Sequence, residues 1–188
     1  MRLISYPVRN NPLGVILIGP RGAGKSSLAP RLAQALGWAH IDLDQAISDQ
    51  VRSDLSEWII AQGWKAFRAL ECEMLANATR RGNHVIACGA GIVESQANHT
   101  GLRAAHSITL WLDIDPNEQE RRLLSDTSRP RLEPEQSLIQ ELHLVDKRRR
   151  ALYRDLSDQR FDAAVAPDLL LSTCLNYIQQ WLDQNTRG

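Results

Sequence analysis

The sequence predicts an α/β fold in which a parallel sheet is flanked by helices. Short apolar runs such as Val15 to Ile18, typical of buried parallel strands, alternate with longer segments whose apolar side chains recur at helical spacing. A glycine-rich turn follows the first run, and Leu28, Leu32 and Leu36 then recur at helical spacing. In such folds, ligands bind at the carboxyl ends of the strands.

Each expected strand is a short, mostly apolar segment bounded by turn or helix signals. The second leads into Asp42 and Asp44, and the third ends in residues 89–91, so polar groups are expected at the carboxyl edge of the sheet. The expected strands cover residues 15–18, 39–41, 84–88, 107–112 and 163–166.

Helices are expected between the strands. Gly37 is suited to end the first helix, and Gly63 is expected to break a later helical stretch. Pro30 lies inside the first helix and removes a backbone hydrogen bond, so a local distortion is expected there. The helices run from the glycine-rich turn to residue 36 and over 45–52, 56–62, 64–81, 116–124, 135–156 and 168–184.

The glycine-rich turn, Gly19-Pro20-Arg21-Gly22-Ala23-Gly24-Lys25-Ser26, matches the phosphate-binding pattern G-x-x-x-x-G-K-[ST] at every fixed position. Backbone N–H groups of such a loop surround phosphate oxygens, and the helix N-terminus adds partial positive charge. Lys25 can reach the β- and γ-phosphates, and the Ser26 hydroxyl can bind Mg²⁺. The pattern favours nucleotide binding over a glycine-rich turn with no ligand.

Composition argues against several classes of protein. Lysine and arginine number 22, as do aspartate and glutamate, so the net charge is zero, which disfavours a general nucleic-acid or membrane-surface binder. No apolar stretch approaches the roughly 18 residues of a membrane span, and no signal peptide is recognised. The three cysteines and five histidines are dispersed, without disulfide or zinc spacing. These features indicate a cytoplasmic globular protein.

Asp42 and Asp44 follow the second expected strand at a spacing of two. One carboxylate at that edge can reach the water shell of Mg²⁺, which keeps several waters in proteins. The other can accept hydrogen bonds from a substrate hydroxyl, or its proton during transfer. Such acids are also common helix N-caps, so that alternative stays open.

Together, these motifs resemble those of the shikimate kinases. That family combines the phosphate loop with D-x-D, F-R-x-x-E on a helix, a glycine triplet, R-P in a lid and R-x-x-L-Y on a late helix. All occur here in family order over about residues 15–153. The likeness is closest to the shikimate kinase segment of the multifunctional arom polypeptides, which tend to share Gly63-Trp64 and a sequence much like residues 91–94. The further motifs are Phe67-Arg68-Ala69-Leu70-Glu71, Gly89-Ala90-Gly91, Arg129-Pro130 and Arg149-Arg150-Ala151-Leu152-Tyr153.

The resemblance implies a P-loop NTPase fold of the nucleoside-monophosphate-kinase type, with a five-stranded parallel sheet flanked by helices and a mobile lid at about residues 122–135. Residues 1–13 are expected to form an N-terminal extension, and residues 14–188 a single P-loop kinase domain. The implied reaction is ATP-dependent phosphorylation of the 3-hydroxyl of shikimate, in aromatic amino-acid biosynthesis. The implied cofactors are ATP and Mg²⁺, and the enzyme is expected to be a monomer without nucleic-acid or membrane partners.

The resemblance also implies roles for the matching residues. Lys25, Asp44 and Arg129 are catalytic, with Asp44 the candidate base and Arg129, on the lid, meeting the transferring phosphoryl group. Ser26 ligates Mg²⁺, and Asp42 holds it through water. The nucleotide-binding residues are Gly22, Ala23, Gly24, Lys25, Ser26, Ser27, Arg122, which stacks on adenine, and Arg129. The substrate-binding residues are Asp44, Arg68, Glu71, Gly89, Ala90, Gly91 and Arg149, with the two arginines on the substrate carboxylate and Glu71 orienting Arg68.

Several alternatives remain open. Arg68 and Glu71 have i,i+3 spacing and could form a surface ion pair. Arg149 sits in a basic run, so Arg148 or Arg150 could be the substrate ligand instead. Another small-metabolite kinase, such as a gluconate kinase, or a non-catalytic shikimate-binding sensor would also fit the fold.

The chain departs from the family pattern at Ala90, where the triplet usually has glycine. An amide is retained, but a Cβ is added where substrate or backbone passes close, and a positive φ there would be strained. We expect Ala90 to weaken substrate binding without abolishing it.

Overall fold

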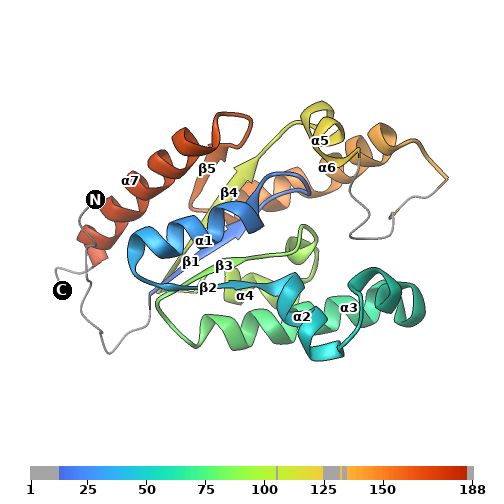
Figure 1. The fold of residues 1–188 in the computed structure, drawn as a ribbon, viewed down its shortest axis with the longest axis horizontal. Coiled ribbons are helices and arrows are strands. Elements are labelled where there is room, and N and C mark those ends of the chain that lie inside the picture. The colour runs from blue at the N-terminus through green and yellow to red at the C-terminus, as the bar shows by residue number, and fades with distance from the viewer. Residues whose placement is uncertain (1–12, 105, 125–131, 133–134, 186–188) are drawn as a thin grey trace.

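The sheet is formed by β1 (Gly14–Ile18), β2 (Ala39–Asp42), β3 (His84–Ala87), β4 (Ser107–Asp113) and β5 (Gln159–Asp162). The computed structural model describes residues 13–104, 106–124, 132 and 135–185. The strands pair in parallel in the order β2-β3-β1-β4-β5 (Figure 1). This topology confirms the predicted five-stranded parallel sheet. The expected N-terminal extension lies outside the described residues except for Leu13.

Helices connect the strands and cover both faces of the sheet (Figure 1). Short 3-10 turns, η1 (Ile92–Glu94) and η2 (Gln96–Asn98), follow β3. Within the described ranges, no helix combines the length and the apolar character needed to cross a membrane. The helices are α1 (Lys25–Leu36), α2 (Leu43–Val51), α3 (Leu55–Thr79), α4 (His99–Leu102), α5 (Pro116–Leu123), α6 (Leu138–Leu156) and α7 (Pro167–Asn185).

Local sequence signals account for most helix ends. Gly37 takes a left-handed conformation after α1, and Gly63, at φ 83°, interrupts α3, so both predicted breaks are confirmed. The helix α1 continues through Pro30. The helix α6 begins at Leu138 rather than at residue 135, because Ser137 and Gln140 form a reciprocal capping box.

Alternating residues of β1 supply two separate cores, one on each face of the sheet. Val15 and Leu17 pack with side chains of α1 and α7. Ile16 and Ile18 pack on the other face with side chains of α3 and α6, including the fully buried Tyr153. Burying each such aliphatic side chain contributes about 1.5–3 kcal/mol relative to leaving it exposed.

The fifth strand was expected at residues 163–166, and that prediction is wrong. The strand is β5, which pairs with β4 at the edge of the described sheet and alternates between half-buried and exposed residues. Because an edge strand is not buried on both sides, it needs no continuous apolar run. The apolar pattern therefore pointed to the segment that follows β5. Ala163 donates a last hydrogen bond to Asp113 O at 2.7 Å, and the amide of Ala164 donates to the Asp162 carboxylate in a turn.

Candidate active site

The phosphate loop lies at the carboxyl end of β1 and leads directly into α1. Its first residue, Gly19, has φ 141°, and a Cβ there would overlap the carbonyl oxygen of Leu112 in the neighbouring strand β4. The loop can therefore lie against the sheet only with glycine at this position. The buried Lys25 Nζ donates to the carbonyl oxygens of Gly19 and Pro20 at 2.8 Å each, which fixes the lysine across the loop.

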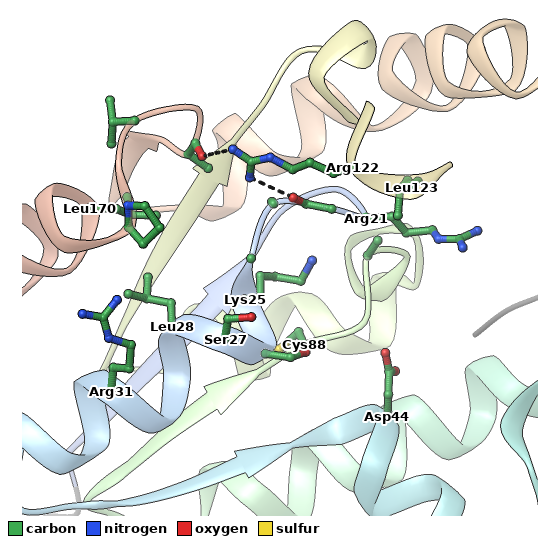
Figure 2. Close-up of a pocket in the computed structure, with 18 residues that line it drawn as sticks. Arg21, Lys25, Ser27, Leu28, Arg31, Asp44, Cys88, Arg122, Leu123 and Leu170 are labelled. Carbon is green, nitrogen blue, oxygen red and sulfur yellow. Dashed lines mark hydrogen bonds between the residues drawn. The ribbon is translucent and has the colours of Figure 1, made fainter. Parts of the chain in front are cut away.

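A cavity of about 560 Å³ opens beside this loop. In Figure 2, the Asp44 side chain points from α2 toward the space in front of the loop, while Cys88 follows β3 at its base. Burial, followed by the charge of Glu71, raises the pKa of the Cys88 thiol, so this side chain is a neutral part of the cavity wall. The predicted site residues that line the cavity are Gly22, Ala23, Gly24, Lys25, Ser26, Ser27, Asp44, Ala90 and Arg122.

The two aspartates after β2 have different surroundings. Asp42 is the N-cap of α2, and its Oδ1 accepts hydrogen bonds from the amides of Asp44 and Gln45 at 3.0 and 3.3 Å. Asp44 lies in the first helical turn and lines the cavity. The capping alternative is thus correct for Asp42, whereas Asp44 faces the cavity.

Arg68 and Glu71 do not form a surface ion pair. Glu71 is completely buried, and its carboxylate pairs with the Arg68 guanidinium, which also lies over the rings of Trp64 and Phe67 at 5.3 and 5.4 Å. A Cβ on Gly91 would collide with that guanidinium. Arg68 is therefore held between α3 and residues 89–91 by charge, aromatic faces and the lack of a side chain at Gly91.

The three arginines of the basic run in α6 reach different partners. Arg149 is 3% exposed, and its Nη2 donates to Glu94 at 2.9 Å. Burial alone would lower the pKa of Arg149, but Tyr153 and Glu94 raise it, so the guanidinium is charged. Arg148 also pairs with Glu94, whereas Arg150 pairs with Asp113 and Asp146. Arg149 and Arg148 thus share a carboxylate with Arg68, and Arg150 does not.

Residues 89–91 contact both the cavity, through Ala90, and Arg68, through Gly91. Arg68, Arg148 and Arg149, which share Glu94, are called the arginine group below. Ala90 is 4% exposed, and its carbonyl accepts a hydrogen bond from Tyr153 Oη at 2.6 Å. Among the described non-glycine residues, only Arg52 and Asn83 have positive φ, so the backbone at Ala90 carries none of the strain that a positive φ would bring.

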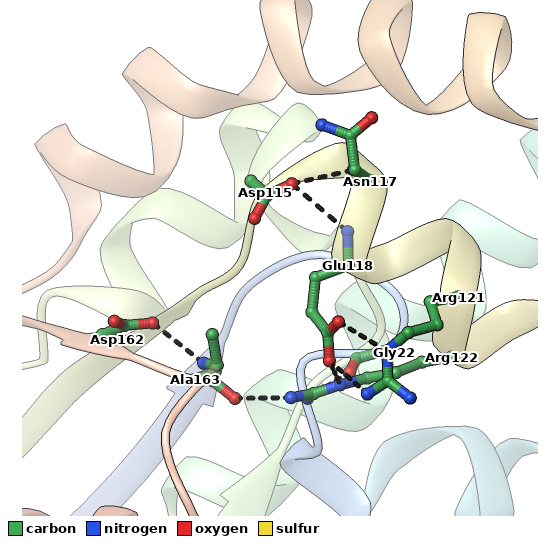
Figure 3. Close-up of polar contacts among 9 residues, drawn as sticks. Gly22, Asp115, Asn117, Glu118, Arg121, Arg122, Asp162 and Ala163 are labelled. Carbon is green, nitrogen blue, oxygen red and sulfur yellow. Dashed lines mark hydrogen bonds and ion pairs between the residues drawn. The ribbon is translucent and has the colours of Figure 1, made fainter.

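Arg122 links the phosphate loop to the end of the sheet, as Figure 3 shows. Its Nη1 donates to Gly22 O at 3.0 Å, its Nη2 to Ala163 O at 2.9 Å and its Nε to Glu118 at 2.7 Å. Hydrogen bonds from Arg121 and Arg122 lower the pKa of Glu118 to about 2. Arg129 and nearly all of the expected lid after residue 124 lie outside the described residues.

Two contributors were not identified from the sequence as site residues. Glu94 accepts bonds from the arginine group, and Tyr153 supports Ala90 and Arg149. Both lie in quoted family motifs, and an acid three residues after the glycine triplet was the available signal for Glu94.

Comparisons with known proteins agree on one family. The family model for shikimate kinase matches residues 21–182. Shikimate kinase 2 of Sodalis glossinidius is 33% identical over 167 residues, which cover 87% of this chain and 94% of that protein. The pentafunctional AROM polypeptide of Clavispora lusitaniae is 36% identical over 159 residues, 81% of this chain and 10% of that polypeptide.

Solved structures agree with this result. The shikimate kinase of Acinetobacter baumannii in complex with shikimate superimposes with a TM-score of 0.82 at 27% identity, over 94% of this chain and 96% of that one. A gluconokinase from Sinorhizobium meliloti shares the fold with a TM-score of 0.59 at 13% identity, over 95% and 98% of the chains. The P-loop fold is therefore common to both, while the sequence similarity is to one family. The chain belongs to the shikimate kinase family.

Proposed function

We propose that the protein transfers the γ-phosphoryl group of ATP to the 3-hydroxyl of shikimate. The observation that carries this proposal is the juxtaposition of a phosphate loop, Asp44 at the cavity wall and two charged arginines, Arg68 and Arg149, held next to residues 89–91. A substrate that carries a carboxylate and several hydroxyls needs guanidinium donors for its carboxylate and a carboxylate acceptor for its hydroxyls.

The nucleotide is proposed to bind along the phosphate loop. Amides of residues 22–27 and the Lys25 ammonium surround the phosphates, since Lys25 lies across the loop and needs only to exchange carbonyl partners for phosphate oxygens. Arg122 is proposed to contact the adenine side of the nucleotide, and its bond to Gly22 O supports that position. Arg129 is proposed to neutralise the transferring phosphoryl group from the lid.

Ser26 and Asp42 suit Mg²⁺. A hydroxyl and a carboxylate are the oxygen ligands this ion prefers, and the Asp42 cap uses only Oδ1. Within the described ranges, no three acidic, histidine or cysteine side chains cluster so as to hold a metal alone, which suits an ion that keeps waters and binds substrate phosphates. When bound, Mg²⁺ would neutralise charge on the β- and γ-phosphates.

The substrate is proposed to bind with its carboxylate on Arg68 and Arg149, with Glu71 orienting Arg68, and with its ring hydroxyls on Asp44 and on amides of Gly89, Ala90 and Gly91. The 3-hydroxyl oxygen attacks the γ-phosphorus, and the bond to the β–γ bridging oxygen breaks, which releases ADP. Asp44 accepts the hydroxyl proton. A closed lid would exclude water and prevent ATP hydrolysis.

Two alternatives are weaker. A gluconate kinase would share the phosphate loop, but Asp44, Arg68 and Arg149 together favour a hydroxylated ring acid. A non-catalytic sensor rests only on Ala90, and the intact Lys25 and Asp44 weigh against it. We propose a monomeric cytoplasmic enzyme in which residues 14–188 form one kinase domain.

ADP formation in the presence of ATP and Mg²⁺ tests this function. We expect saturable ADP formation that depends on shikimate and not on gluconate. The Arg129→Ala variant should lose most of kcat while keeping ATP binding. Gluconate-dependent ADP formation, or shikimate binding without ADP formation, would contradict the proposal and favour the corresponding alternative.

A further inference from the structure

A third acid lies among the arginines proposed to bind the substrate carboxylate. Glu94 ends the 3-10 turn η1, three residues after Gly91. Its Oε2 is 2.9 Å from Arg149 Nη2 and 3.5 Å from Arg68 Nη2. Its Oε1 is 2.8 Å from Arg148 Nε. One oxygen of Glu94 therefore bridges the two arginines, and the other contacts a third.

Burial explains why this acid is needed. Arg149 is 3% exposed and the Arg68 side chain 19%, so both guanidiniums require a counter-charge close by. Glu71 provides that charge for Arg68, and Glu94 provides it for Arg149. Burial would raise the pKa of Glu94, but the hydrogen bond and charge of Arg149, with Arg148 and Arg68, lower it, so the acid is ionised near neutral pH.

The bridging oxygen lies where a ligand carboxylate would make the same contacts. We propose that Glu94 is an internal stand-in for the substrate carboxylate, which holds Arg68 and Arg149 in place and is displaced from them when substrate binds. This inference rests on the proposed function and adds a positioning residue that sets substrate affinity.

The neighbouring Arg148 makes such a displacement possible. Its side chain is 49% exposed, and it contacts the other oxygen of Glu94, so the carboxylate can turn toward Arg148 and remain paired when it leaves the two buried arginines. The Nε of Arg149 is buried and has no hydrogen-bond partner within the described part of the chain. A ligand carboxylate can therefore use a donor that Glu94 leaves unsatisfied.

Competition between Glu94 and the substrate carboxylate for the two arginines lowers the apparent affinity for shikimate. If Glu94 occupies the arginines most of the time, the substrate binds only the remaining fraction of molecules, and its apparent dissociation constant rises in proportion. The variant Glu94→Gln keeps the shape and one acceptor but loses the charge. We expect it to lower KM for shikimate by about threefold or more, with kcat within about twofold of wild type.

The matched control is Glu73→Gln, which removes the same charge from an exposed position of α3 and should leave KM unchanged. A second variant, Arg148→Gln, removes the alternative partner of Glu94. It should raise KM, and this rise should disappear in the Glu94→Gln background. The second variant keeps the inference testable if Glu94→Gln folds poorly.

Shikimate binding to the nucleotide-free protein, measured by titration calorimetry, tests the inference without catalysis. Tighter binding by Glu94→Gln than by wild type supports it. Equal or weaker binding, or an unchanged KM in an active enzyme, overturns it while leaving the kinase function intact. Tight binding without any ADP formation would refute the kinase function and not the inference, and no binding to either protein would overturn both.

Discussion

The buried Tyr153 hydroxyl connects the core of the protein to its site, so Tyr153→Phe is an informative change. The residue is 1% exposed, its ring stacks on Trp111 at 5.9 Å, and its Oη donates to Ala90 O at 2.6 Å. Arg149 is close enough for its charge to act on the same hydroxyl, in the direction that lowers its pKa. Phenylalanine keeps the ring contacts and removes the hydrogen bond to Ala90 O.

The expected loss of stability follows from the buried polar group that loses its hydrogen-bond partner. A buried carbonyl that loses its hydrogen-bond partner costs about 1–3 kcal/mol. For a chain of this size each kcal/mol lowers Tm by about 2–4 °C, so a fall of roughly 2–12 °C is expected. Because Ala90 and Arg149 belong to the proposed substrate site, KM for shikimate should rise about 2- to 10-fold, with kcat largely retained.

The pH dependence of this effect has a defined sign. Burial raises the pKa of Tyr153 from 10 to about 12. A group whose pKa is higher in the folded state stabilises that state below its unfolded pKa and loses this contribution as pH rises through the folded value. The stability difference between wild type and Tyr153→Phe should therefore be constant up to about pH 10 and shrink between 10 and 12.

Thermal unfolding and steady-state kinetics of the two proteins provide the assay. Tyr177→Phe is the matched control, because that ring is only partly buried and water can replace a lost contact. It should change Tm by little. Equal effects of the two substitutions, or an unchanged Tm in Tyr153→Phe, would refute the role given to this hydroxyl.

Three further predictions concern Gly91, Ala90 and the three cysteines. Gly91→Ala should raise KM for shikimate and lower Tm, because the added methyl displaces the Arg68 guanidinium, which pairs with the buried Glu71 carboxylate; a normal KM would contradict this. Ala90→Gly should lower KM, and unchanged kinetic constants would show that the extra methyl is harmless. Cys72 should react with a thiol reagent much faster than Cys88 and Cys174 in the folded protein, because it is partly exposed while burial raises the pKa of the other two thiols. Equal rates for all three thiols, measured by mass spectrometry, would contradict that order.

The central part of the fold was predictable from the sequence because the local sequence signals there agree with the tertiary packing. Mostly apolar segments indicated four of the five strands, and Gly37 and Gly63 indicated two helix breaks. The strand β5 was misplaced because Gln159–Asp162 holds a single apolar residue, Phe161, and the more apolar residues 163–166 follow it. Its existence depends on pairing with β4. Pairing partners are not visible in a single local pattern.

The candidate site was predictable in its components more than in its contacts. Motif order indicated that Asp44, Arg68 and residues 89–91 would gather at one edge of the sheet. Which of the neighbouring arginines pairs with which acid depends on helix rotation and burial, and only the structure separates Arg149 from Arg150. The arginine partners of Glu94 lie 26 and 55 residues away in sequence, so its spacing from the glycine triplet could mark the acid but not the bridge that it forms.

The central claim is that charged arginines select a carboxylate-bearing substrate for phosphoryl transfer, and ADP formation with shikimate and with its methyl ester tests it most directly. The ester keeps the ring hydroxyls and lacks the negative charge. Hydrogen bonds to charged groups contribute about 1.5–3 kcal/mol, so kcat/KM should be roughly 10- to 150-fold lower for the ester. Equal efficiency with the two compounds, or no ADP formation that depends on shikimate, would contradict the account.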